Sequence, residues 1–308
     1  MQAGKILLAF STDLGIALWG DCKDIFSRLD GQQIHLCLTS PPYPLRKPRA
    51  YGNPPESEYV DFICSAMEPV IKNMAKSGSI CLNLSNDIFL AGLPARSLYR
   101  ERLVIALHDR LGLFKMDELI WHNPCKPPGP MEWASKTRQQ LNVGWEPIYW
   151  FCLDPKECRS NNRRVLQPHT EKHLKFIEAG GVTQKRISSD GAYTVKEGSY
   201  SSPTPGRIPR NLLTFPHNCA DQRAYKKAAK DLGVEAHGAG YPLSMSKFLI
   251  EFMTQKDDLV VDPMAGSFTT AKAAQELGRR WLACDVIYDY ARGGAERFKN
   301  APEFSLFI

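Results

Sequence analysis

The stretch Leu38-Thr39-Ser40-Pro41-Pro42-Tyr43 follows a short apolar run, Ile34 to Leu38, that has the length of one buried strand. A second stretch, Val261-Asp262-Pro263-Met264-Ala265-Gly266, follows a similar run near the other end of the chain. Both stretches therefore leave the carboxyl edge of a predicted sheet. In open α/β sheets this is the edge that binds ligands.

Strands and helices alternate around both stretches, which predicts an α/β fold with its sheet split between the two ends of the chain. Two strands in mid-chain are expected to form an antiparallel edge. Helices are predicted over 58–76, 96–111, 246–253, 269–277 and 288–299, and strands over 34–38, 79–84, 114–121, 148–153, 259–261 and 281–284.

The composition is that of a globular protein, with 43% hydrophobic and 23% charged residues. A chain of 308 residues can form one large core and an inserted smaller unit. The apolar runs Ile6 to Phe10 and Ile148 to Leu153 are far shorter than the ~20 residues of a membrane span. We therefore expect a cytoplasmic protein without a membrane partner.

The cysteines and histidines predict no metal site. The nine cysteines lie largely in predicted strands, and no Cys-x-x-Cys pair occurs. His169 and His173 have the i, i+4 spacing of helical metal ligands, and Cys158 precedes them, but a convincing fourth ligand is missing. A solvated polar helix face is the better interpretation.

The two loops together resemble the catalytic and cofactor motifs of the amino-directed DNA methyltransferases. The Ser-Pro-Pro-Tyr sequence with a preceding Thr is most similar to the N4-cytosine branch of that family. Because the catalytic motif precedes the cofactor motif, the order is that of the circularly permuted beta class. The resemblance also covers 19–22, 78–83, 145–148, 237–242 and 279–285.

This resemblance implies a Rossmann-like class I methyltransferase sheet, circularly permuted, with an inserted target-recognition region. Residues 1–151 would form the catalytic part, 152–234 the target-recognition insert, and 235–308 the part of the same domain that binds S-adenosylmethionine.

The basic charge is concentrated in the region that does not match the family. Residues 156–230 contain fifteen Lys and Arg against six Asp and Glu, a net charge of +9, whereas the rest of the chain carries 24 basic and 27 acidic residues, a net charge of −3. Such an asymmetry is typical of a nucleic-acid surface, and double-stranded DNA is the expected partner. The candidate DNA contacts are Arg46, Lys47 and Arg49 after the catalytic loop, and Arg163, Arg164, Lys185 and Arg186 in the insert.

The catalytic candidates are Ser40, Pro41, Pro42 and Tyr43. An exocyclic amine is a poor nucleophile because its lone pair is delocalised into the ring. Acceptors such as the Ser40 hydroxyl and the Pro41 carbonyl would localise that pair and stabilise the charge that grows on nitrogen. The two prolines would stiffen the loop, and Tyr43 would stack on an extruded base. Methylation of a ring carbon needs a cysteine nucleophile, but Cys125 lies in a proline-rich segment away from this loop.

By resemblance the cofactor is S-adenosylmethionine. Asp262 would accept from its amine, Asp285 from its ribose hydroxyls, Asp21 would lie near its adenine, and His237 with Pro242 would enclose its methionine moiety. The remaining candidates come from the cofactor loop: Pro263, Met264, Ala265, Gly266, Ser267 and Thr269.

The cofactor loop departs from the family pattern. Met264 stands where Phe is usual and Phe268 where Gly is usual, and Gly238 and Tyr241 replace Pro and Lys. A bulky Phe268 at a tight loop would either fill a hydrophobic wall or alter the loop.

Three functions are therefore compared: methylation of cytosine N4, methylation of adenine N6, and DNA binding by a relative that has lost catalysis through Phe268. RNA and protein substrates suit the long basic insert less well. A cognate restriction endonuclease would be a further partner, and the protein would act as a monomer or homodimer.

Overall fold

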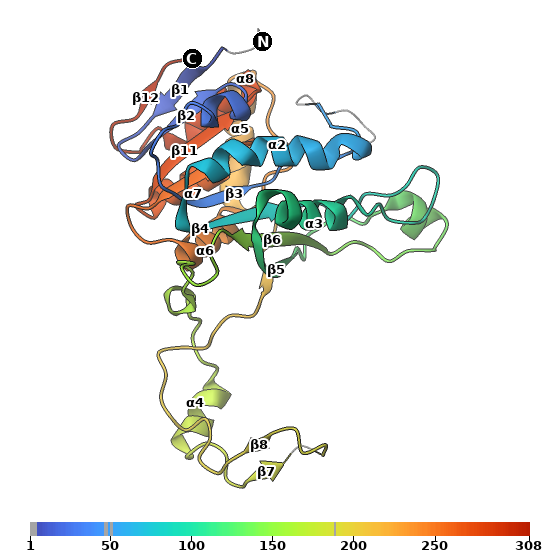
Figure 1. Ribbon diagram of the computed structural model, residues 1–308, viewed down its shortest axis with the longest axis vertical. Coiled ribbons are helices and arrows are strands. Elements are labelled where there is room, and N and C mark those ends of the chain that lie inside the picture. The colour runs from blue at the N-terminus through green and yellow to red at the C-terminus, as the bar shows by residue number, and fades with distance from the viewer. Residues whose placement is uncertain (1–4, 46–48, 50–51, 188) are drawn as a thin grey trace. The chain divides into compact units, whose positions relative to one another are not determined.

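A computed structural model describes residues 5–45, 49, 52–187 and 189–308 of the chain (Figure 1). The chain divides into two compact units. The first unit consists of Met1–Ser160 and Asn211–Ile308, and the second of Asn161–Arg210.

The first unit is built on one large sheet. In the described part of the chain this sheet has ten strands in the order β12-β1-β2-β11-β10-β3-β4-β6-β5-β9. The five strands from β2 to β4 are parallel to one another, and the pairs β4–β6 and β5–β6 are antiparallel. The strands are β1 Leu7–Ser11, β2 Gly15–Trp19, β3 Ile34–Thr39, β4 Met74–Asn83, β5 Phe114–His122, β6 Trp145–Cys152, β9 Leu212–Thr214, β10 Leu259–Asp262, β11 Arg280–Asp285 and β12 Ser305–Leu306.

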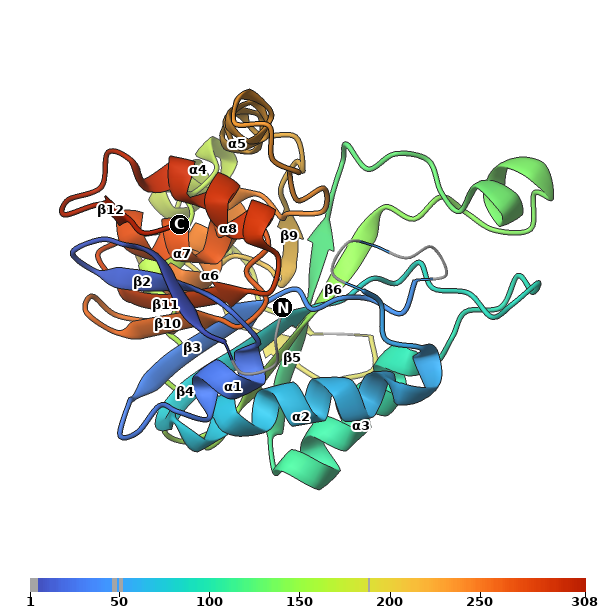
Figure 2. The ribbon, with the colours of Figure 1, turned by 90° about the horizontal axis from the view of Figure 1, so that it is seen from above.

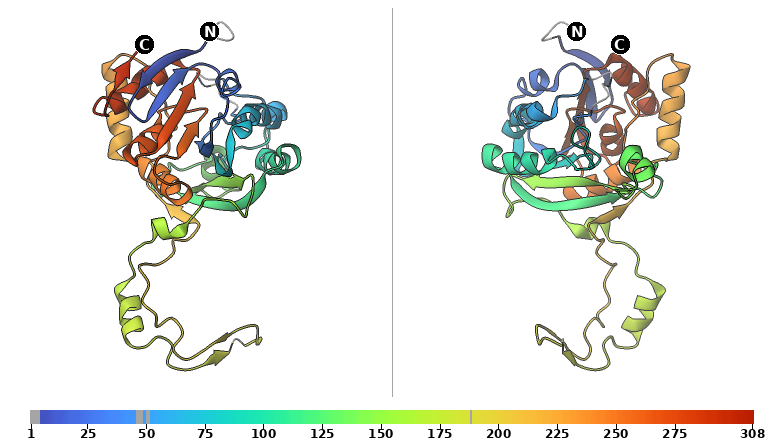
Figure 3. Two further views of the ribbon diagram at one scale, coloured as in Figure 1. Left: turned by 60° about the vertical axis from the view of Figure 1, so that its left-hand side comes forward. Right: turned by 90° about the vertical axis from the view of Figure 1, so that its right-hand side faces the viewer.

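Helices cover both faces of the sheet, as Figures 2 and 3 show. One face packs against α1 Cys22–Phe26, α2 Tyr59–Lys72 and α3 Tyr99–Leu111, and the other against α6 Leu243–Met253, α7 Thr269–Glu276 and α8 Tyr288–Ala295. Side chains of the central strands alternate between the two cores. In β11, for example, Trp281 and Ala283 enter one core, while Leu282 and Cys284 enter the other. The predicted α/β fold is confirmed.

Several boundaries differ from the prediction by a few residues, and two of them lie between α2 and β4. The helix expected to reach Lys76 ends at Lys72, and the strand expected from Ser79 begins at Met74. The strand boundary involves Gly78, where a Cβ atom would lie 2.8 Å from the carbonyl oxygen of Ile34. The glycine lets β4 approach β3 closely enough to pair earlier, with a shift of register between Ile34 and Leu36.

Several elements have no counterpart in the prediction. In the first unit they include β1, β2, α1 and β12 near the two ends, β9, and helix α5, which spans Ala220–Asp231. Helix α5 lies inside the predicted insert of residues 152–234, but it belongs to the first unit. The compact second unit is therefore narrower than that insert.

The second unit contains α4 Glu171–Glu178 and a small antiparallel pair, β7 Arg186–Ile187 with β8 Thr194–Val195. Nine Lys and Arg against four Asp and Glu give residues 161–210 a net charge of +5. Across both units, no described helix is long and apolar enough to cross a membrane.

Candidate active site

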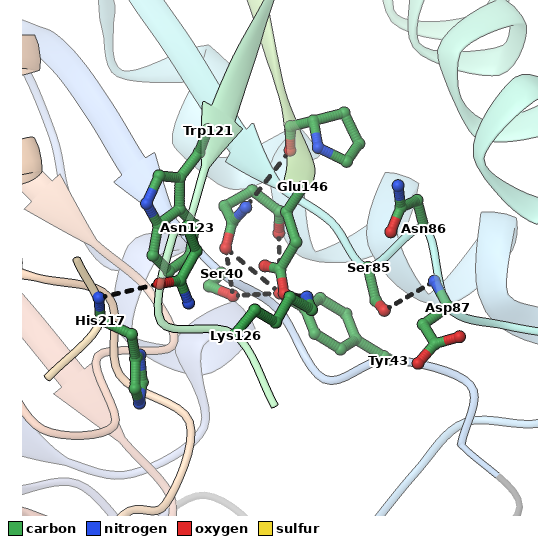
Figure 4. Close-up of polar contacts among 12 residues, drawn as sticks. Ser40, Tyr43, Ser85, Asn86, Asp87, Trp121, Asn123, Lys126, Glu146 and His217 are labelled. Atoms are coloured by element: carbon green, nitrogen blue, oxygen red, sulfur yellow. Dashed lines mark hydrogen bonds and ion pairs between the residues drawn. The ribbon is translucent and has the colours of Figure 1, made fainter. Parts of the chain in front are cut away.

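The Ser-Pro-Pro-Tyr loop begins directly after Thr39, the last residue of β3. The Ser40 hydroxyl oxygen lies 2.8 Å from the Tyr43 hydroxyl oxygen, and 3.4 Å from the side-chain oxygen of Asn83 at the end of β4. The Tyr43 hydroxyl also lies 3.3 Å from that amide oxygen. Figure 4 shows Ser40 and Tyr43 pointing toward each other from the two ends of the loop.

Asn83 holds this pair in place. The residue is 2% exposed, and its amide nitrogen donates to the Pro147 carbonyl of β6 at 3.3 Å. With its nitrogen used in this way, the amide oxygen faces the two hydroxyls and accepts from them. The sequence motif containing Asn83 was noted, but the residue was not predicted to belong to the site.

The catalytic and cofactor loops line one cavity of about 180 Å³. Ser40, Pro41, Pro42 and Tyr43 form part of its wall, so the structure brings together two stretches from opposite ends of the chain. Of the predicted cofactor residues, Asp21, His237, Pro263, Met264, Gly266 and Asp285 line this cavity, and Asp262, Ala265, Ser267 and Thr269 line a narrow adjoining one. Pro242 lines neither cavity and instead precedes the first residue of α6.

Two buried carboxylates stand at the strand ends beside this cavity. Burial raises the pKa of Asp262 and that of Asp285 to about 6. Asp285 accepts from the backbone N–H groups of Gly266 at 2.8 Å and Ile287 at 2.9 Å, while Asp262 accepts from that of Met264 at 3.2 Å. These hydrogen bonds favour the ionised forms and partly offset the cost of burial. Asp285 thus fixes the cofactor loop as well as lining the cavity.

His237 is a buried neutral side chain at the junction of the two cavities. Burial, assisted by the charges of Lys226 and Arg49, lowers the pKa of His237 to about 4. Its ring lies edge-on against Tyr290, with the centroids 5.0 Å apart. The imidazole therefore carries no charge at neutral pH.

Phe268 fills a hydrophobic wall and does not enter either cavity. The side chain is fully buried and packs on Phe10, with ring centroids 5.4 Å apart. A Cβ atom added at Gly294 of α8 would lie 2.5 Å from the Phe268 ring, so this glycine makes room for the aromatic side chain. The backbone of Phe268 is left-handed, with φ of 58°, which is uncommon for a residue other than glycine. The loop therefore forms its tight turn, and the Phe268 side chain packs in the hydrophobic core.

Helix α5 and the segment after α8 contact and stabilise the cofactor loop. The sequence did not predict these contacts. The Arg297 side chain donates to the Ser267 carbonyl and, at 2.9 Å, to the Thr269 hydroxyl, and it pairs with Asp221 of α5. Gln222 of α5 donates to the same Thr269 hydroxyl at 3.0 Å. No motif points to Arg297, because its partners lie 28 and 76 positions away in the chain.

The predicted DNA contacts fall into two groups. Arg46 and Lys47 lie outside the described residues, and Arg49 is exposed after the catalytic loop. Arg163, Arg164, Lys185 and Arg186 all belong to the second unit, where Arg163, Lys185 and Arg186 are exposed. These four are therefore placed in one compact, basic unit.

The histidine pair is not part of a larger cluster. The rings of His169 and His173 are 4.8 Å apart between centroids, and His169 Nε2 lies 2.8 Å from the Thr204 hydroxyl. Among the described residues, no group of three or more His, Cys, Asp or Glu side chains could hold a metal ion.

Comparison with known proteins gives the class of this chain. The DNA methylase family matches residues 34–296, and the chain belongs to that family. It is 31% identical over 292 residues to the type II methyltransferase M.PvuII of Proteus hauseri, covering 94% of this chain and 85% of that protein. It is 20% identical to the DNA adenine methyltransferase YhdJ of Escherichia coli K12, covering 99% and 90%.

Solved structures agree with this assignment. The PvuII DNA methyltransferase, described as cytosine-N4-specific, superposes with a TM-score of 0.72 and 28% identity over 95% of this chain and 90% of that one. The M1.HpyAVI–SAM complex has a TM-score of 0.55 and 13% identity over 93% and 100%, which supports the fold. The protein is thus an α/β enzyme of the DNA methyltransferase class.

Proposed function

We propose that this protein transfers a methyl group from S-adenosylmethionine to the N4 amine of cytosine in double-stranded DNA. The observation that carries the proposal is the position of the Ser40 hydroxyl. It is fixed by Tyr43 and Asn83 at the end of β3, and it borders both the main cavity and the narrow one.

The cavity suits S-adenosylmethionine because of its two buried carboxylates. Asp262 and Asp285 are ionised at neutral pH although burial disfavours it, so a ligand that brings a cation and hydroxyl donors would stabilise them. The amine and the ribose of S-adenosylmethionine are such groups. Asp262 would hold the amine and Asp285 the ribose, with Asp21, His237, Met264, Gly266, Ser267 and Thr269 around them. The bound cofactor would supply the methyl group.

The chain's own contribution would be to position and polarise the N4 amine of the cytosine. Ser40 Oγ and the Pro41 carbonyl would accept from the two N–H groups and stabilise the positive charge on nitrogen until its proton is lost. The hydrogen bonds of Ser40 to Tyr43 and Asn83 fix the acceptor before the substrate arrives, which lowers the cost of reorganisation. No covalent bond to the enzyme is needed, so Cys125 has no role.

The base would have to leave the duplex to reach Ser40, and Tyr43 would stack on it. The basic second unit, through Arg163, Arg164, Lys185 and Arg186, would bind the surrounding DNA, and Arg49 would add charge near the catalytic loop. We assign the chain to the permuted beta class on the order of its motifs. A cognate restriction endonuclease, a cytoplasmic location and a monomeric or dimeric state stay predictions.

Methylation of adenine N6 is the second candidate, because YhdJ is described as an adenine methyltransferase. The impaired-enzyme alternative loses its main argument, since Phe268 lies in the core and not in the cavity.

Mass spectrometry of nucleosides from DNA treated with the purified protein and S-adenosylmethionine tests the proposal. We expect N4-methylcytosine with the wild-type protein and almost none with Ser40→Ala. N6-methyladenine would support the second candidate instead. Absence of both, with bound cofactor shown by calorimetry, would contradict either reaction.

A further inference from the structure

The segment between β5 and β6 forms a projecting arm that neither core explains. This β5–β6 arm, residues 123–144, is much longer than most connections in a compact domain, and such loops are usually functional. Two backbone hydrogen bonds tie its legs together: Asn123 N–H donates to Gly144 O at 2.9 Å, and Val143 N–H to Gly129 O at 2.8 Å. Figures 1 and 2 show it extending from the end of the sheet.

The tip of the arm is a compact, defined knob. A wide helical turn spans Met131–Lys136. The Trp133 carbonyl then accepts from the backbone N–H groups of Gln139 at 2.8 Å and Gln140 at 3.0 Å, and from the Thr137 hydroxyl at 3.2 Å. The tip is also fastened to the loop after β4, because the Gln140 side chain donates to Pro94 O at 2.9 Å.

Despite this internal order, the knob exposes apolar side chains. Leu141 is 87% exposed and Met131 is 60% exposed. Arg138, between them in sequence, has a left-handed backbone with φ of 61°, a strained conformation that persists at functional sites. Of the large hydrophobic side chains in the described residues, Leu141 is the most exposed, and it is held there by an ordered backbone.

The root of the arm adjoins the catalytic loop. Pro147, at the start of β6, accepts through its carbonyl oxygen from Asn83, the residue that contacts Ser40 and Tyr43. Figure 4 shows Asn123 and Lys126 of the arm, together with Glu146 at the start of β6, in the same close-up as Ser40 and Tyr43. A duplex that delivers a base to Ser40 would therefore pass close to the arm.

The polar groups at the tip match DNA better than a second protein copy. Lys126 is paired with Glu146, and Lys136 with Glu132 at 2.7 Å, whereas Arg138 is exposed and forms no ion pair with a described residue. The exposed side-chain amides of Gln139 and Asn142 stand on either side of Gln140–Leu141 in the sequence. Guanidinium and amide groups pair with base edges, and apolar side chains of this kind wedge between base steps.

We propose that the β5–β6 arm enters the duplex beside the target base, with Leu141 as the wedge that fills the space left by the extruded base and Arg138 as an anchor on the DNA. This inference rests on the proposed function and adds to it a second DNA-binding element that belongs to the same unit as the catalytic loop.

The test compares Leu141→Ser with a matched control, Ile105→Ser. Ile105 lies on α3, is 60% exposed, and should not meet DNA. Single-turnover methylation is measured on a duplex whose sequence comes from modified-base sequencing of DNA treated with the wild-type protein. A second duplex differs only in a mismatch opposite the target base, which removes most of the cost of extrusion.

We expect Leu141→Ser to lower the rate about tenfold on the paired duplex and less than about twofold on the mismatched one, because the wedge acts on unstacking. Ile105→Ser should match the wild type on both duplexes. Arg138→Gly, which keeps the left-handed backbone accessible, should weaken DNA affinity and flatten its dependence on log salt by ~0.9.

If Leu141→Ser lowered the methylation rate equally on paired and mismatched DNA, the proposed role of Leu141 as a wedge would be wrong. Wild-type rates for Leu141→Ser on both duplexes would contradict it as well. A change from dimer to monomer in sedimentation with Leu141→Ser, together with such equal losses, would assign the arm to self-association. A wild-type protein that methylates no DNA would instead remove the proposed function, and the arm's role with it.

Discussion

Ser40 and Tyr43 have separable tasks that single substitutions can distinguish. Ser40→Ala removes an acceptor for the amine, and we expect the rate of methyl transfer to fall by ~10²–10³. The affinity for S-adenosylmethionine should hardly change, because the Ser40 hydroxyl is assigned to the exocyclic amine of the base and not to the cofactor. Single-turnover kinetics and calorimetry measure the two quantities. A fully active Ser40→Ala variant would contradict the assignment.

Tyr43→Phe removes only the hydroxyl that touches Ser40 and Asn83, and Tyr43→Ala also removes the ring. We expect Tyr43→Phe to lower the rate modestly and leave the affinity for a mismatched duplex unchanged. Tyr43→Ala should also weaken that affinity, since stacking on one base contributes ~1–3 kcal/mol. Equal affinities for the two variants would show that the ring does not stack.

Asp262 and Asp285 give the protein a defined response to pH. Their pKa values of about 6 lie above the ordinary value of 3.8, so the folded state holds these protons more tightly than the unfolded state does. Their contribution to stability is therefore complete below about pH 4 and disappears as the pH rises through about 6. Affinity for S-adenosylmethionine should change in the opposite sense and fall as the carboxylates become protonated.

Thermal unfolding of the ligand-free protein between pH 4 and 7 measures the first effect. The difference in Tm between Asp285→Asn and the wild type should shift in favour of the variant as the pH rises. Calorimetric titration with S-adenosylmethionine over the same range measures the second. A pH-independent difference in Tm would show that Asp285 titrates normally.

At the scale of elements, α5 and the segment after α8 act together on the cofactor loop. Arg297→Met removes the donor to the Ser267 carbonyl and one of the two donors to the Thr269 hydroxyl. It also leaves Asp221 with Lys272, at 3.3 Å, as its remaining ion-pair partner. We expect the free energy of unfolding to fall by ~1–3 kcal/mol, because the Ser267 carbonyl loses its side-chain donor, and cofactor affinity to fall as well. Arg297→Lys should recover part of the stability but little of the affinity, because one ammonium cannot replace the forked contacts.

Chemical denaturation and calorimetry at a temperature where the variants are folded separate these two effects. Arg292→Met is a matched control on α8, since Arg292 pairs with Glu296 at 2.8 Å, whereas Arg297 donates to the cofactor loop. If Arg297→Met lowered the free energy of unfolding but left cofactor affinity unchanged, the contacts of Arg297 would stabilise the fold without affecting cofactor binding.

The sequence predicted some elements well, and the reasons for its failures are physical. The two ligand loops were recognisable because each needs a short buried strand followed by residues with special backbones, such as Pro41 and Gly266. Asn83 and Arg297 act through partners far away in the chain, and no local pattern encodes such contacts. Residues 220–231, which form α5, were included in the insert because they match no family motif, whereas Tyr225 and Ala229 bury one face of this helix in the first unit.

On the scale of the whole molecule, charge is distributed unevenly. The second unit carries a net +5, so it should supply attraction to DNA of any sequence. Replacing Arg163, Arg164, Lys185 and Arg186 by Gln should weaken binding to all sequences alike. Log affinity against log salt should flatten by ~0.9 for each lost phosphate contact.

Fluorescence anisotropy with duplexes of different sequence, at several salt concentrations, measures this slope. Arg102→Gln with Arg110→Gln on α3 is the control, because these exposed cations already pair with Glu56 and Asp61. A loss of sequence preference at constant slope would mean that the four residues read bases.

The pairing of β3 with β10 has a consequence for how the protein is made. The Leu259 N–H donates to His35, 224 residues earlier in the chain, and both ligand loops leave these two neighbouring strands. A nascent chain that has already displayed Ser40 and Tyr43 outside the ribosome cannot yet close the cavity, since Asp262, Gly266 and Asp285 are still to come. Contacts between such distant residues also form late in folding. The cavity therefore cannot be complete before synthesis has passed β11.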